Sequence, residues 1–123
     1  MKELQQLVGN FLVDRPRMAE NNSDPEVMFK LLRDEVDEAE AEIDSDPETM
    51  ARELADVVFF TMTLANQYGI DLGEAIREKT ARNHVKYPAV MFQNGRSYTE
   101  AKRMARDQWK ETGGDDQFYE PTQ

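Results

Sequence analysis

Apolar residues recur at intervals of three and four along almost the whole chain, and this period constrains the fold more than any other feature of the sequence. It matches the 3.6-residue turn of an α-helix, whereas a half-buried strand alternates at every second position. Leu4, Leu7, Val8 and Phe11 already follow the helical period near the N-terminus. The sequence therefore predicts an all-α protein.

Helix boundaries can be placed from capping signals. The string Ser-Asp-Pro-Glu occurs at 23–26 and again at 45–48. Its Asp suits the N-cap, its Pro the first helical position and its Glu the first turn. Gly69 and the pair Gly113-Gly114 are stop signals. We expect helices over 4–12, 25–43, 47–68, 71–87 and 99–110, a loop over 88–98 and frayed residues after 114.

The linked helices favour a four-helix bundle, because no linker rich in glycine or proline divides the chain. We expect a single domain over residues 1–123, in which 25–88 form the core that carries the motifs and 89–123 a C-terminal extension with a short extra helix. The helix over 47–68 is apolar on nearly every face. One subunit cannot easily cover such a helix, so we expect the protein to be at least a homodimer.

The composition narrows the functional classes. Asp and Glu total 25 against 15 Lys and Arg, and the formal net charge is −10. Such a surface repels nucleic acid and anionic membranes, so neither is expected as a partner. The absence of cysteine removes disulfides, zinc-thiolate sites and thiol nucleophiles. No apolar run approaches the length of a membrane span, and we expect a soluble, cytoplasmic protein.

Four carboxylates occupy positions where apolar residues would be expected. Glu35 falls within the apolar arc of the second predicted helix, and Glu38 falls at its edge. Asp56 is the only charged residue between positions 54 and 70, and Glu53 lies close to the same buried side. We expect Asp56 to be partly buried, which is costly for an ionised carboxylate unless a cation or hydrogen bonds stabilise it.

Each pair of acids has the spacing i and i+3, so an antiparallel packing of the two helices would bring the pairs together. All-oxygen ligands select magnesium, manganese or calcium over zinc and copper, and magnesium is favoured where substrate phosphates complete the coordination shell. The alternative is that these acids lie on solvated helix faces, which is the usual place for glutamate.

A basic counterpart follows on the fourth predicted helix. Lys79, Asn83 and Lys86 lie on one stripe at i, i+4 and i+7, with Tyr87 adjacent. Two ammonium groups beside an amide suit a polyphosphate, although a solvated face near a helix C-terminus would also favour cations. His84, the only histidine, projects away from this stripe and is expected at the surface. Trp109 and the nearby basic residues could cover a neighbouring subunit or the entrance of a site.

These motifs, in this order and spacing, resemble those of the MazG-type all-α nucleoside triphosphate pyrophosphohydrolases. The family pattern is Glu-Glu-x-x-Glu, a spacer, Glu-x-x-Asp, and a downstream Lys-x-x-x-Asn followed by a basic residue, Tyr and Pro. Residues 34–38, 53–56 and 79–88 match it in turn, with Asp34 in place of the first Glu. The resemblance covers about 31–88.

The resemblance implies a dimer or a dimer of dimers that releases pyrophosphate from a nucleotide by attack of water. It implies that Mg²⁺, with Mn²⁺ as a substitute, is bound by Glu35, Glu38, Glu53 and Asp56. It implies that Lys79, Asn83, Lys86 and Tyr87 contact the phosphates. A carboxylate near the cluster would orient the water, and Glu35 is our assignment for this catalytic role. The family's base pocket tends to involve the N-terminal part, where Phe11, Arg15, Met18 and Phe29 are candidates.

Three other functions remain open at this point. Phosphoribosyl-ATP pyrophosphohydrolase and a dUTPase-like enzyme use the same scaffold and metal chemistry. A non-catalytic, acidic helical interaction module is the alternative from another class. Retention of all four acids together with Lys79 and Asn83 argues against the non-catalytic module.

Overall fold

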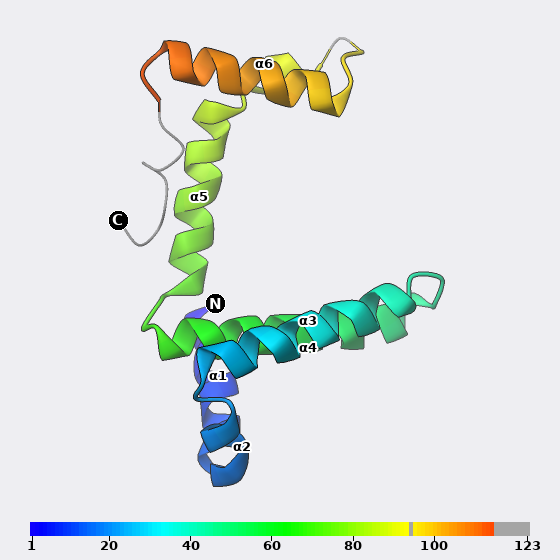
Figure 1. The fold of residues 1–123 in the computed structure, drawn as a ribbon, viewed down its shortest axis with the longest axis vertical. Helices are drawn as coiled ribbons and strands as arrows, with labels where there is room; N and C mark the ends of the chain where they lie inside the picture. The colour runs from blue at the N-terminus through cyan, green and yellow to red at the C-terminus, as the bar shows by residue number, and fades with distance from the viewer. Residues whose placement is uncertain (94, 115–123) are drawn as a thin grey trace. The chain divides into compact units, whose positions relative to one another are not determined.

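The computed structural model describes residues 1–93 and 95–114, and within these ranges the chain contains helices and no strand (Figure 1). The all-α prediction is therefore confirmed. Two compact units make up the chain, Met1–Leu72 and Gly73–Gln123. In chain order the helices are α1 (Lys2–Val13), α2 (Pro16–Asn21), α3 (Pro25–Ala41), α4 (Pro47–Gln67), α5 (Leu72–Lys86), the 3-10 helix η1 (Ala89–Phe92) and α6 (Tyr98–Glu111).

The first unit is built around a hairpin of α3 and α4, which run antiparallel and side by side (Figure 1). Both helices begin where the capping signals placed them. The side chain of Asp24 accepts a hydrogen bond from the Glu26 N–H (2.9 Å), and that of Asp46 accepts one from the Thr49 N–H (2.7 Å). The end of α4 also agrees, because Gly69 follows its C-cap with a positive φ of 65°. Local chemistry thus sets the ends of the hairpin.

Helix α1 packs against the C-terminal half of α4. Gln5 is buried there, and its amide nitrogen donates to Asn66 Oδ1 (3.1 Å) and to the Ile70 carbonyl (2.8 Å). The Gln5 side-chain oxygen accepts from the Leu72 N–H (2.8 Å). The core of this unit lies in the same region, with Met28 fully buried and the α4 residues from Met62 to Ala65 buried beside it.

Two features of this unit bear on the sequence prediction. Helix α2 was not among the predicted helices, and Pro16 occupies its first turn. Apolar side chains of α4 are left uncovered, since Leu54 is 52% exposed and Val58 is 43% exposed. The reason is that α3 and α1 cover only part of the α4 surface within this unit.

The second unit contains most of α5, then η1 and α6. Helix α6 packs against η1, which lies in the segment expected as a loop. Ser97, and not the predicted Thr99, caps α6 by accepting a hydrogen bond from the Glu100 N–H (3.2 Å). Gly95, between η1 and α6, has a φ of 74°, a conformation that favours glycine. The frayed tail expected after 114 lies outside the described residues.

The four-helix packing, the single domain and the dimer stay predictions. Among the described residues, no helix combines the length and the apolar character needed to cross a membrane.

Candidate active site

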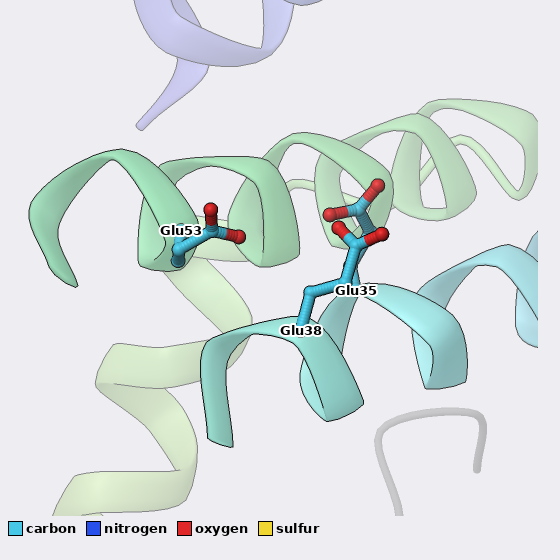
Figure 2. A group of neighbouring side chains, drawn as sticks. All are labelled: Glu35, Glu38 and Glu53. Atoms are coloured by element: carbon cyan, nitrogen blue, oxygen red, sulfur yellow. The ribbon is translucent and has the colours of Figure 1, made fainter. Parts of the chain in front are cut away.

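The hairpin of the first unit brings three of the predicted carboxylates together. Glu35 and Glu38 come from α3 and Glu53 comes from α4. Figure 2 shows the Glu35 and Glu38 side chains rising toward α4, where Glu53 turns toward them. Each of the three offers a carboxylate oxygen that lies within 4.8 Å of those of the other two. Antiparallel packing therefore brings three of the four predicted carboxylates into one cluster.

The cluster is short of hydrogen-bond donors. Glu35 and Glu53 are half-buried, and one carboxylate oxygen of each, Oε2, is buried without a hydrogen-bond partner among the described residues. Burial raises the pKa of the Glu35 carboxyl from its ordinary 4.5 to about 7, helped by a hydrogen bond with Glu38 and by the negative charges of Glu38, Asp56 and Glu53.

Asp56 lies in a different environment from the other three predicted ligands. It was expected to be partly buried, but it is exposed. The expectation rested on the apolar character of α4, and much of α4 around this position is itself uncovered in the unit. Asp56 is not one of the three residues with mutually close oxygens, although its charge contributes to the raised pKa of Glu35. Its role as a metal ligand stays a prediction.

The three clustered residues fit a hard divalent cation. They offer only oxygen atoms, as magnesium and manganese prefer. The orphaned Oε2 atoms of Glu35 and Glu53 are the specific sign of fit, because a buried carboxylate oxygen without a donor is costly unless a cation stabilises it. Three carboxylates leave room for further ligands, which is typical of a site that also binds phosphates.

The second unit holds the predicted basic residues in a pocket of about 530 Å³. Lys79, Asn83, Lys86 and Tyr87 all line it, so the stripe predicted from the sequence forms one wall. The described residues that line the pocket include no acid, although the chain carries a net charge of −10. A pocket lined by cations in so acidic a protein favours an anionic ligand.

The Tyr87 phenol forms a hydrogen bond with Arg106 of α6. Burial acts to raise its pKa, but hydrogen bonds with Arg106 and Lys86, together with their positive charges, bring the pKa below its usual value. The Lys86 ammonium nitrogen also lies 5.3 Å from the centre of the Tyr87 ring. Arg106, one of the basic residues near Trp109 that could cover a neighbouring subunit or the entrance of a site, therefore positions a residue of the pocket.

Three further residues of the pocket were not among the predicted site residues. They are Phe92 from η1, and Tyr98 and Lys102 from α6. Lys102 was among the basic residues near Trp109 that could cover a neighbouring subunit or the entrance of a site. Phe92 and Tyr98 were missed, because they lie in the segment expected as a loop. His84 is exposed, as predicted.

The candidate base-binding residues near the N-terminus are exposed in part. Phe11, Met18 and Phe29 are 41%, 44% and 48% exposed. The Phe11 ring is already engaged, because it makes an edge contact with Phe59 and the Arg15 guanidinium lies 3.9 Å from its centre. These residues stay hypotheses for base recognition.

The helical hairpin with its carboxylate cluster is the feature by which the chain can be compared with known proteins. The chain belongs to the MazG-like family, whose family model matches residues 27–100, more than half of the sequence. The match begins within α3, includes α4, α5 and η1 and ends within α6. Neither a curated protein nor a solved structure matches the chain. Membership suggests a nucleotide pyrophosphohydrolase type of activity, and the family resemblance inferred from residues 31–88 is confirmed.

Proposed function

We propose that this protein is a magnesium-dependent nucleoside triphosphate pyrophosphohydrolase, which converts a (d)NTP and water into the (d)NMP and pyrophosphate. The observation that carries the proposal is the cluster of Glu35, Glu38 and Glu53, in which two buried carboxylate oxygens have no hydrogen-bond partner within the described part of the chain. Family membership supports the same class of reaction. The role would be control of the nucleotide pool or removal of unwanted nucleotides.

The residues that would hold Mg²⁺, or Mn²⁺ in its place, are Glu35, Glu38, Glu53 and Asp56. When bound, the metal neutralises phosphate charge and lowers the pKa of the attacking water. We assign to Glu35 the orientation of that water and the acceptance of its proton. The half-buried position of Glu35 within the cluster supports this assignment, since a general base must lie within reach of the water that it activates.

The pocket of the second unit supplies the groups for the phosphates. The ammonium groups of Lys79 and Lys86 would neutralise phosphate oxygens as point charges, and the planar amide of Asn83 would orient one of them. The Tyr87 phenol already interacts with Arg106 and Lys86. We therefore propose that Tyr87 acts mainly by holding the Lys86 ammonium in place.

The active protein is proposed to be a homodimer or a dimer of dimers. The support is the large exposed fraction of apolar side chains on the hairpin, such as Leu54 and Val58. Exposed apolar residues on one helix face are typical of an interface.

One experiment tests the function directly. The protein is incubated with magnesium and a panel of all canonical and several modified (d)NTPs, and pyrophosphate and orthophosphate are measured separately. We expect pyrophosphate and a monophosphate. Orthophosphate from the γ position would refute the assignment. Activity confined to phosphoribosyl-ATP, or to dUTP, would select one of the two related enzymes. No turnover of any substrate would favour a non-catalytic module.

A further inference from the structure

Three aromatic rings form a row along the pocket of the second unit. The Tyr87 and Phe92 ring centroids are 6.1 Å apart, and those of Phe92 and Tyr98 are 6.4 Å apart. The rings follow one another along the chain: Tyr87 comes directly after α5, Phe92 ends η1 and Tyr98 begins α6. The pocket is therefore partly walled by the C-terminal extension.

Tyr98 is the ring most available to a ligand. Its residue is 69% exposed although it lines the pocket, so its ring contributes little to the core. A large exposed aromatic side chain on the wall of a pocket offers a face on which a planar group can stack.

Lysine side chains line the same pocket as the aromatic rings. Lys79, Lys86 and Lys102 line the same pocket, and the Lys102 nitrogen lies 5.5 Å from the centre of the Tyr98 ring. Inorganic phosphate would use the lysines but not the rings, and a neutral apolar ligand would use the rings but not the lysines. A nucleotide uses both, because it combines a planar base with a chain of anionic groups. The pocket volume of about 530 Å³ falls within the range usual for small-molecule sites.

We infer that this pocket also binds the base of the nucleotide, which stacks on Phe92 and Tyr98, while Lys102 joins Lys79 and Lys86 in holding the phosphates. The inference rests on the proposed function, since it concerns another part of the same substrate. It gives the C-terminal extension a role in substrate binding and places base recognition away from the N-terminal candidates. Phe11 is the less suitable ring, because it does not line the pocket that holds the lysines.

The side chains that line the pocket also predict which nucleobases it prefers. Stacking depends on ring area and tolerates every base, whereas strict selection needs buried hydrogen-bonding groups. Phe92 offers only a ring, and the exposed Tyr98 offers a ring face together with a solvated hydroxyl. We therefore expect purine nucleotides to bind severalfold more tightly than pyrimidine nucleotides, without exclusion of either class.

Calorimetric titration of the full chain in magnesium buffer tests the inference. The probes are the α,β-methylene analogues of dATP and dCTP, in which the bond to be broken is blocked, and inorganic tripolyphosphate, which lacks a base. Tyr98→Leu and Phe92→Leu should each weaken the dATP analogue about 10-fold and leave tripolyphosphate within about 2-fold. Lys102→Gln should weaken both probes, and Tyr98→Phe should bind like the wild type.

The matched control is Tyr68→Leu, which removes a tyrosine that is 61% exposed on the first unit and should change neither probe. Equal loss of both probes in Tyr98→Leu would overturn the inference, because the ring would then be structural. Loss of the dATP analogue in Phe11→Leu but not in Tyr98→Leu would also overturn it. The expected binding pattern without hydrolysis of dATP itself would uphold the inference and refute the proposed function.

Discussion

The carboxylate cluster of the first unit and the lysine pocket of the second unit carry opposite charges, and the proposed function assigns both to a substrate with several negative charges. The cluster concentrates negative charge on two packed helices, and two of its buried oxygens have no donor among the described residues. The pocket gathers lysines around aromatic rings, in a unit formed by a helix, a 3-10 turn and another helix. The carboxylates of the cluster repel one another, which raises the pKa of Glu35, whereas the pocket contains a favourable contact between Lys86 and the Tyr87 ring.

The two regions should therefore respond differently to the removal of one charged side chain. Removing a charge from the cluster should abolish chemistry and relieve repulsion in the metal-free protein. Removing a charge from the pocket should weaken substrate binding and leave the stability of the fold nearly unchanged.

The largest effect is expected for Glu53→Gln. Loss of a metal ligand should lower kcat/KM at least about 100-fold, since even the loss of an outer partner of a ligand commonly costs 10- to 100-fold. The metal-free variant should melt at or above the temperature of the wild type, because one of the repelling carboxylates is gone. Steady-state pyrophosphate release measures kcat/KM, and thermal melts in EDTA measure the stability of the metal-free protein. Undiminished turnover of wild type or variant in EDTA would show that the cluster does not serve catalysis.

An intermediate effect is expected for Lys79→Gln. An ammonium group that binds a phosphate oxygen contributes about 10- to 100-fold to affinity, so KM should rise by this factor while the melting temperature stays within about 1 °C. Lys30→Gln, at an exposed position on α3 outside the pocket, is the control. An unchanged KM would mean that the pocket does not contact the substrate.

The raised pKa of Glu35 predicts how the metal-free protein responds to pH. The folded protein keeps the Glu35 proton up to about pH 7, whereas the unfolded chain loses it near 4.5. The folded state binds more protons in this window, so its free energy of unfolding should fall as the pH rises from about 4.5 to about 7. We expect a fall of about 1 to 2 kcal/mol, less than the full shift because Glu35 is partly solvated.

Urea titrations in EDTA at several pH values measure this slope. Glu35→Gln should flatten it, and saturating magnesium should remove it, because the cation stabilises the ionised carboxylate. Stability that rises over the same window would contradict the raised pKa.

The smallest effect is expected for the stability of Asp56→Asn in EDTA. Asp56 is exposed, so its replacement should change the free energy of unfolding by no more than about 0.5 kcal/mol. As a predicted ligand, Asp56 should nevertheless be required for activity and for the rise in melting temperature that magnesium causes in the wild type. A variant with normal activity and a normal magnesium response would remove Asp56 from the site.

Much of the fold could be predicted because its signals are local. Asp24 and Asp46 cap the helices of the hairpin, and Gly69 follows the end of α4. The convergence of Glu35 and Glu53 was also predictable, since the i and i+3 spacing and a short connection leave few other packings. Helix α2 was missed because Pro16 is compatible with both the end of one helix and the start of another.

By itself, the sequence determined most of the helices, the N-terminal ends of the two hairpin helices and the two acid pairs, because capping and periodicity depend only on residues a few positions apart. Only the tertiary structure decided which acids are buried and which rings face the pocket. Asp56 is exposed because α1 and α3 cover a limited part of α4. Tyr98 stands beside Phe92 because η1 and α6 pack together after a turn at Gly95. Burial and ring contacts depend on which surfaces meet, and that is a property of the packed chain as a whole.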